Sequence, residues 1–149
     1  MMMNRIHCLD EGKFSIWLES PELLSPNGLL IEQNRVVVGS WGVMTDGFAT
    51  EISGHLLAVS LSDKSISSIG DGTSVGNLDG VERDQDGNYY VTDWMAGKLF
   101  YIQADGEVEV LLTLVQGMAD HEYIAEKDLV ILPMMNTGQL LAFKLHLDM

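Results

Sequence analysis

Three side chains that carry oxygen, Asn27, Asp79 and Asp120, each stand directly before a short, strand-like apolar segment. Each also precedes a bulky apolar residue by 14 or 15 positions, in the pairs Asn27–Trp41, Asp79–Trp94 and Asp120–Met134. Oxygen atoms of Asp and Asn are the ligands that hard divalent cations such as Ca²⁺, Mg²⁺ and Mn²⁺ prefer. We therefore expect these three residues to bind a divalent cation if the fold brings them together.

A repeat in the sequence predicts the fold that would do so. Gly54, Gly97 and Gly138 each begin a segment with the same plan, in which a polar residue and a short apolar run follow the glycine. The glycines are 43 and then 41 residues apart. A period in the low forties is typical of one four-stranded propeller blade. The sequence predicts an all-β chain, a β-propeller with about three four-stranded blades and no long helix.

The first strand of a propeller blade lines the central channel, so residues that start these strands share one mouth of the channel. Asn27, Asp79 and Asp120 would then face a common axis. An alternative stays open, because Pro26-Asn27-Gly28 and Asp79-Gly80 are also ordinary turn sequences. The spacing alone does not show whether Asn27 and Asp79 are metal ligands or turn residues. Their equivalent positions in successive repeats favour the interpretation as ligands.

The chain is expected to be a single half-propeller domain over residues 1–149. Outer strands occupy residues 4–19, and the blades occupy 27–76, 77–117 and 118–145. The first blade contains an insert at 43–53 that is rich in Gly and Thr, and the third blade shows only three strand segments.

Three blades cannot close a ring, because closed propellers hold four to eight blades. An open arc exposes apolar faces and strand edges, which favour association. We expect a homodimer that completes a six-bladed ring, or a piece of a longer protein. In the homodimer, Phe14, Ile16 and Leu18 are expected to supply the strand that the third blade of the partner lacks.

The charge of the chain limits its partners. The formal net charge is −14 and there are only eight Lys and Arg residues, so the sequence argues against nucleic-acid binding and favours cation capture. Residues 1–19 contain no apolar core of a signal peptide, and no segment is apolar over a membrane-spanning length. We expect a cytoplasmic protein that does not bind membranes, with a periplasmic location left open for a chain that has lost an N-terminal segment.

Other residues near the expected mouth are weaker candidates. There is no G-x-S-x-G motif, no phosphate-binding glycine loop and no pair of cysteines. Trp41, Trp94 and the Met134-Met135 pair recur at the end of the second strand, where packing between blades is the first interpretation and a pocket wall the second.

His121, next to Asp120, could be a base or a ligand, but alternation points it away from the side of Asp120 and favours packing in the core or an interface. Glu122 alternates onto the channel face, whereas Glu82 does not.

Several of these residues carry a resemblance to a known family. Ser25 to Leu29 (SPNGL), Leu78 to Val81 (LDGV), Asp86 to Trp94 (DGNYYVTDW) and the Ala119-Asp120 pair resemble the senescence-marker-protein-30/gluconolactonase/luciferin-regenerating-enzyme-like family of six-bladed β-propellers. The likeness covers about residues 5–145 and is to the C-terminal half of that family.

The resemblance implies a divalent metal in the central channel and often the hydrolysis of a sugar lactone. Asn27 matches the family's asparagine ligand, and Asp79 matches the aspartate that serves as a ligand and as the proposed catalytic base. Asp120 has no assured counterpart, and the family's N-terminal glutamate ligand has no equivalent in this chain. Two functions follow as alternatives: a metal-dependent lactone or ester hydrolase, or a non-enzymatic propeller that binds a small molecule or a protein.

Overall fold

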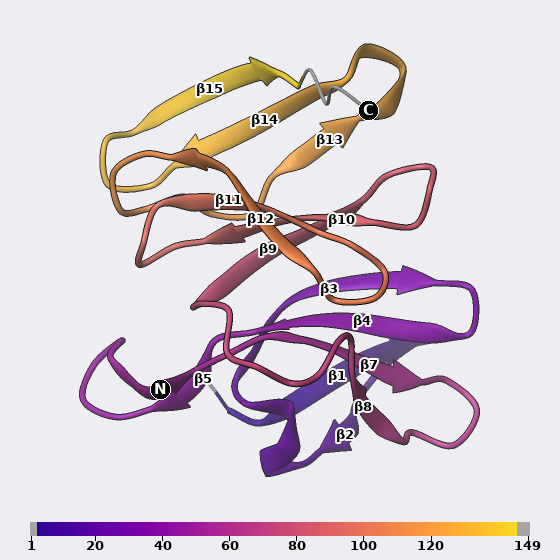
Figure 1. Cartoon of the computed structure of the whole chain (residues 1–149). Coiled ribbons are helices and arrows are strands. Elements are labelled where there is room, and N and C mark those ends of the chain that lie inside the picture. Colours follow the sequence, from indigo (N-terminus) through magenta and orange to yellow (C-terminus); the bar gives the residue numbers. More distant parts are fainter. Residues whose placement is uncertain (1–2, 146–149) are drawn as a thin grey trace.

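The computed structural model describes residues 3–145 and is all-β (Figure 1). Within that range the only helical segments are two single 3₁₀ turns, η1 (Pro21–Leu23) and η2 (Ala125–Lys127). No helix of this part of the chain is long and apolar enough to cross a membrane. The predicted fold class, with no helix longer than about two turns, is therefore confirmed.

Four groups of antiparallel strands follow one another along the chain. The first is the N-terminal hairpin, with β1 (Arg5–Asp10) and β2 (Lys13–Glu19). The first blade has the order β3 (Pro26–Glu32), β4 (Arg35–Ser40), β7 (Leu56–Ser60) and β8 (Ile66–Ser68). The second blade has the order β9 (Leu78–Arg83), β10 (Tyr89–Asp93), β11 (Lys98–Ile102) and β12 (Val108–Thr113). The third sheet contains β13 (Glu122–Ile124), β14 (Leu129–Met134) and β15 (Gln139–Lys144).

The insert of the first blade also folds into strands. Residues 43–53, expected only as a Gly- and Thr-rich connection, contain most of a small hairpin of β5 (Gly42–Met44) and β6 (Thr50–Ser53). This hairpin forms a sheet separate from the four-stranded blade. It leaves the blade after β4 and returns to it at β7, so its tip is free to lie over a neighbouring surface.

The central strands are buried on both faces, which explains their composition. Val36, Val37 and Val38 of β4 are almost fully buried, as are all five residues of β10. A strand covered on both faces favours a continuous β-branched or aromatic run rather than alternation. The β-branched run at 36–38 therefore indicates a central strand directly from the sequence.

The hydrophobic core lies between blades. One cluster joins the first blade to the second through residues such as Val37, Val81 and Tyr89. A second cluster joins the second blade to the third, and a third cluster packs Ile6, Trp17 and neighbouring residues of the N-terminal hairpin onto the first blade. The sheets are stacked in Figure 1 from the N-terminal hairpin to the third blade. The hairpin therefore lies where a preceding blade would pack.

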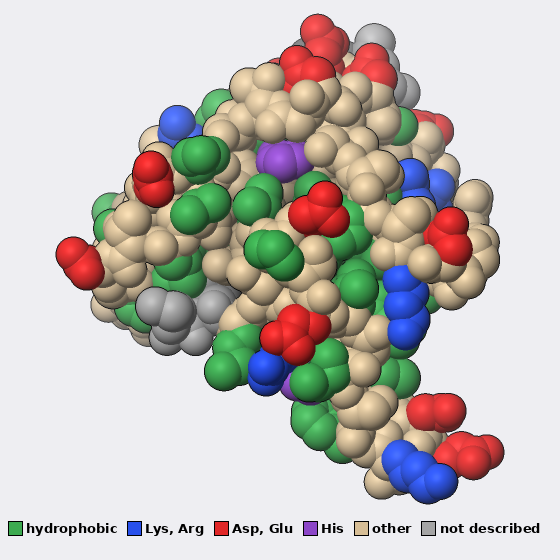
Figure 2. Space-filling model, turned by 90° about the horizontal axis from the view of Figure 1, so that it is seen from below, with side chains coloured by type: hydrophobic (Ala, Val, Ile, Leu, Met, Phe, Trp, Pro, Cys, Tyr) green, Lys and Arg blue, Asp and Glu red, His purple; other side chains and the backbone are tan. Residues whose placement is uncertain are grey.

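Apolar side chains are exposed at both ends of this stack. Phe14 of the hairpin is 72% exposed, and Leu140 on β15 is 71% exposed. Figure 2 views the molecule from below and shows hydrophobic side chains at the surface with acidic side chains spread among them. The homodimer expected from the sequence would cover these two faces, because it joins the N-terminal hairpin of one copy to the third blade of the other.

Candidate functional site

Asn27, Asp79 and Asp120 lie at the same end of adjacent inner strands. Asn27 is the second residue of β3, Asp79 is the second residue of β9, and Asp120 lies just before β13. The Asn27 side-chain amide donates a hydrogen bond of 3.4 Å to the Leu78 carbonyl oxygen. The Asp79 carboxyl group lies near enough to both the Asn27 amide and the Asp120 carboxylate for each to influence its pKa.

Two glycines explain how the inner strands come so close. A Cβ atom at Gly28 would lie 1.9 Å from the Asp79 carbonyl oxygen, and one at Gly80 would lie 2.6 Å from Oδ1 of Asp120. Neither glycine has a positive φ angle, and both lie inside strands. These glycines therefore permit contact between neighbouring blades and do not form the turns that the alternative interpretation requires.

The electrostatics of Asp79 are unusual for a surface aspartate. Burial raises the pKa of Asp79 to about 6; the negative charge of Asp120 also raises it, and the hydrogen bond with Asn27 opposes the change. The ion pairs of the described residues join Arg5 to Glu19 and Glu32 to two arginines, so none of them includes Asp79. Asp79 is a half-buried carboxylate without a cation beside it in residues 3–145.

A pocket opens beside this carboxylate. It has a volume of about 210 Å³ and is lined by Asn27, Trp41, Phe48, Asp79, Trp94 and Met135. The centroids of the Trp41, Phe48 and Trp94 rings lie 6.0–6.1 Å from one another, with the ring planes tilted by 44–58°. Trp41 and Trp94, predicted to pack between blades, therefore also form one wall of a pocket next to Asn27 and Asp79.

Sequence reasoning missed Phe48, whereas Met135 belongs to the Met134-Met135 pair that was considered as a pocket wall. Phe48 stands between β5 and β6, and its backbone carbonyl oxygen accepts a hydrogen bond of 2.9 Å from Trp41 Nε1. Met135 follows β14, and its sulfur lies 3.3 Å from Trp94 Nε1. Phe48 is the one aromatic residue of the insert at 43–53, and that was the available signal.

A second group of carboxylates continues from Asp120 along the inner strands. Burial raises the pKa of Glu82 to about 7, and the negative charges of Glu122 and Asp120 raise it further. Glu122 was expected on the channel face and Glu82 was expected away from it. The structure places both near Asp120, because Glu82 lies on the face of β9 that Gly80 turns toward the third blade.

His121 is part of the packing between blades. It is buried, and neither ring nitrogen makes a hydrogen bond within the described residues. Burial lowers its pKa to about 4, so the ring is neutral at physiological pH. Its Nδ1 atom would lie 2.7 Å from a Cβ atom on Gly80, which places the ring against β9. This location agrees with the expected role in packing.

The described residues do not by themselves form a metal-binding site. Among residues 3–145 no group of three or more His, Cys, Asp and Glu side chains is arranged to hold a metal ion. Asn27, Asp79 and Asp120 bring two carboxylates and one amide oxygen to the mouth. Ca²⁺ takes six to eight oxygen ligands. A cation at this mouth would therefore need water molecules or further protein groups in addition to these three residues.

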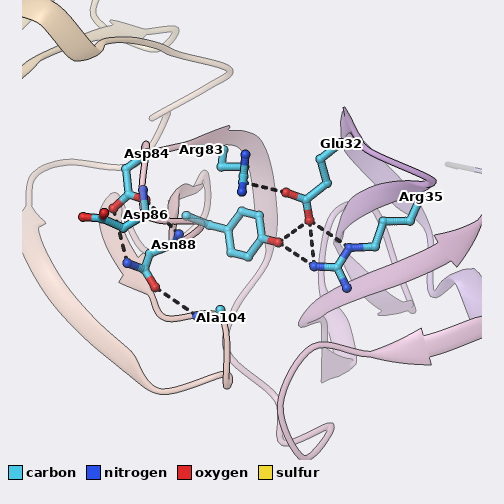
Figure 3. Close-up of polar contacts among 8 residues, drawn as sticks. Glu32, Arg35, Arg83, Asp84, Asp86, Asn88 and Ala104 are labelled. Carbon is cyan, nitrogen blue, oxygen red and sulfur yellow. Dashed lines mark hydrogen bonds and ion pairs between the residues drawn. The ribbon is translucent and has the colours of Figure 1, made fainter.

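The opposite end of the inner strands has a structural role (Figure 3). Glu32, at the end of β3, pairs with Arg35 at 2.7 Å and with Arg83 of the second blade at 2.8 Å. The Tyr89 hydroxyl donates a hydrogen bond to the same carboxylate. These contacts join the first two blades across a buried acidic group.

The sequence Asp84 to Asn88, which resembles the start of a calcium loop, forms the hairpin turn between β9 and β10. Oδ1 of Asp84 accepts hydrogen bonds from the backbone N–H groups of Asp86 and Asn88 at 2.9 and 2.8 Å. The turn is also visible in Figure 3. The Asp84 carboxylate thus accepts backbone hydrogen bonds that stabilise the turn.

Comparison with known proteins supports the fold. No protein-family model and no curated protein sequence matches the chain. Among solved structures, a streptogramin B lyase is similar with a TM-score of 0.57 and 15% identity, covering 95% of this chain and 48% of that chain. A catalytically inactive virginiamycin B lyase from Staphylococcus aureus with quinupristin gives a TM-score of 0.57, 14% identity and coverages of 95% and 49%. A selenomethionine form of virginiamycin B lyase from the same organism gives a TM-score of 0.53, 13% identity and coverages of 97% and 50%.

These likenesses concern the fold alone, because the identities are low. The similar structures support the β-propeller fold of this chain. The chain spans about half the length of each of them. The chain therefore has the architecture of roughly half a β-propeller, with its candidate site at one end of the inner strands.

Proposed function

We propose that this chain forms half of a gluconolactonase-like propeller and that its channel mouth hydrolyses a lactone or ester with the help of a divalent cation. One observation carries the proposal: Asn27, Asp79 and Asp120 converge beside an aromatic pocket. Oxygen ligands on one side and an apolar wall on the other are the usual composition of a small-molecule site. The motifs around Asn27 and Asp79 support the same chemistry by resemblance.

Asn27, Asp79 and Asp120 carry the oxygen ligands that a hard divalent cation prefers. Asn27, Asp79 and Asp120 would hold it through oxygen atoms, and the ion would polarise the carbonyl group of the substrate. Binding of a cation would also relieve the repulsion between Asp79 and Asp120, which are left without a cation in the described residues. The remaining coordination positions would be filled by water or by the other half of the ring.

Asp79 is suited to act as the base. Its pKa of about 6 leaves it mostly ionised at pH 7 while keeping it more basic than an ordinary aspartate. It would accept a proton from the attacking water as the oxygen of that water bonds to the carbonyl carbon. The ester C–O bond then breaks, and the proton passes to the leaving oxygen. The products are a carboxylic acid and an alcohol.

Ring closure by a second copy belongs to the same proposal. The exposed face of β1 and β2 would meet the third sheet of the partner, which lacks a fourth strand within the described residues. That shared blade would receive three strands from one copy and two from the other, one more than a four-stranded blade holds. The strand at residues 5–9, within β1, would therefore be displaced or would replace a strand of its neighbour on dimerisation. A two-fold arrangement would bring a second Asn27, Asp79 and Asp120 to one channel.

A non-enzymatic binding function is the second candidate. The aromatic wall favours it, because Trp41, Phe48 and Trp94 offer a site for a ligand whether or not a metal is bound. A chain that lacks the glutamate ligand of the family can keep such a pocket and lose hydrolysis. In that case the mouth would bind a small molecule without converting it.

Calorimetric titration with Ca²⁺, Mg²⁺ and Mn²⁺, together with a lactone-hydrolysis assay, tests the first function. Asp79→Asn is expected to weaken metal binding at least tenfold and to abolish hydrolysis, while the circular dichroism spectrum stays unchanged. Asp86→Asn is the matched control, because Asp86 is an exposed residue of the β9–β10 turn. Equal metal affinity in wild type and Asp79→Asn would refute the assignment of Asp79 as a ligand.

A further inference from the structure

We propose that the pocket formed by Trp41, Phe48 and Trp94 beside Asp79 binds a small organic cation of the quaternary ammonium or alkylammonium class. This inference rests on the proposed small-molecule function of the channel mouth, and it names the class of ligand. It requires neither a bound metal nor hydrolysis. It can therefore fail or succeed separately from the proposed reaction.

The arrangement of the three rings is the first argument. Their centroids lie 6.0–6.1 Å apart, and all three rings line the same pocket. The faces of aromatic rings carry a negative quadrupole that attracts a cation within about 6 Å of the ring centroid. Because Trp41 is only 3% exposed, a ligand in this pocket of about 210 Å³ would chiefly contact Phe48 and Trp94, with Trp41 behind them. Recognition of quaternary ammonium groups uses this combination of rings.

The charge of the pocket is the second argument. Asp79 is the acidic residue of the pocket lining, and no Lys, Arg or His lines the pocket with it. Asp120 adds further negative charge nearby. A neutral ligand would leave the half-buried Asp79 carboxylate without compensation, whereas an organic cation would neutralise it. Rings and carboxylate together therefore favour a cation over a neutral molecule of equal size.

The insert of the first blade is the third argument. Among residues 3–145 only this blade has an additional hairpin, and the connection between β5 and β6 brings Phe48 to the two tryptophans. Phe48 is 61% exposed even though it contacts both rings. The ring of Phe48 is therefore accessible to a ligand in the pocket.

The size of the pocket limits the ligand. About 210 Å³ is smaller than the roughly 300–1,000 Å³ of sites for drug-sized molecules. The pocket suits a headgroup such as trimethylammonium or a short alkylammonium group. A longer molecule would have to place its remaining part along the channel mouth, near Asn27.

The test uses the full chain and three probes: tetramethylammonium, choline and 3,3-dimethyl-1-butanol, the uncharged isostere of choline. Binding is measured by calorimetry and by tryptophan fluorescence in the presence of a chelator, so that no divalent cation takes part. We expect both cations to bind and choline to bind at least about tenfold more tightly than its isostere. Equal affinity for choline and the isostere, or no detectable binding of either cation, would overturn the proposal.

Variants at an exposed residue separate aromatic recognition from apolar contact. Phe48→Leu keeps an apolar side chain and removes the ring, and Phe48→Ala removes both. We expect the two variants to lose choline affinity to a similar degree, about threefold to tenfold, with unchanged circular dichroism spectra. If Phe48→Leu binds choline as the wild type does, the ring face is not the recognising group and the proposal fails. A chain that binds choline and hydrolyses no lactone would refute the proposed reaction while leaving this inference in place.

Discussion

Replacement of Glu32 is the sharpest test of how the first two blades are held together. The Glu32 side chain is only 8% exposed and contacts three partners, Arg35, Arg83 and the Tyr89 hydroxyl. Glu32→Gln keeps the shape and removes the negative charge. Two guanidinium groups then lose their counter-charge at the boundary between blades, and burial of an uncompensated charge is costly.

The magnitude follows from the exposure of the partners. Breaking a fully buried ion pair costs about 3–5 kcal/mol. The Arg35 and Arg83 side chains remain 42% and 37% exposed, so water compensates part of the loss. We expect Glu32→Gln to lower the free energy of unfolding by about 2–3 kcal/mol, with a fall in melting temperature of roughly 5–10 °C.

Urea denaturation at pH 7, followed by tryptophan fluorescence, measures this change. The control is Glu19→Gln, which breaks the solvent-facing ion pair between Arg5 and Glu19 and should cost less than about 1 kcal/mol. Similar losses for Glu32→Gln and Glu19→Gln would refute the reasoning, because the contact between blades would then contribute no more than a surface pair.

Three further predictions concern packing, pH and assembly. Gly28→Ala should lower the free energy of unfolding by at least about 3 kcal/mol, because its Cβ would meet the Asp79 carbonyl oxygen. Gly138→Ala, with open space at its Cβ, should lower it by only about 1 kcal/mol, as measured by denaturation. The raised pKa of Glu82, about 7, means that the native state holds its proton more tightly, so stability falls as pH rises from about 4.5 to 7. Glu82→Gln should therefore raise the free energy of unfolding by about 1 kcal/mol at pH 8, a value reduced because Glu82 is partly exposed. At pH 4.5 the variant and the wild type should be equally stable. A stabilisation that did not depend on pH would contradict this cause. Sedimentation should show a particle of about twice 16.4 kDa that Phe14→Asp shifts toward the monomer, and a folded wild-type monomer at all concentrations would reject the homodimer.

The fold could be predicted because its signal repeats. The spacing of the glycines recurs from blade to blade and indicates the turns. The β-branched run at 36–38 indicates a central strand within the first blade. The positions of Asn27 and Asp79 at the start of inner strands follow from the same register. Because successive blades are related by the symmetry of the propeller, equivalent positions in the sequence predict side chains that lie close together.

The pocket could be predicted only in part, because Phe48 lies outside the repeat. Phe48 belongs to an insert that the other blades do not share, so no equivalent position indicates where its side chain points. Glu82 was expected away from the channel face, and its proximity to Asp120 and Glu122 was not predicted, since alternation gives two faces but does not say which neighbour each face meets. That information comes from Gly80, whose missing side chain lets the third blade approach.

The same two glycines explain why the candidate site is located at this end of the blades. Gly28 and Gly80 remove side chains where the inner strands cross most closely, and the residue preceding each of them is Asn27 or Asp79. Close approach of the backbones brings these polar side chains together and partly buries Asp79, which raises its pKa. A larger residue at either glycine would separate the blades and return Asp79 to solvent. The packing of the blades and the chemistry of the mouth therefore depend on the same dipeptides, Asn27-Gly28 and Asp79-Gly80.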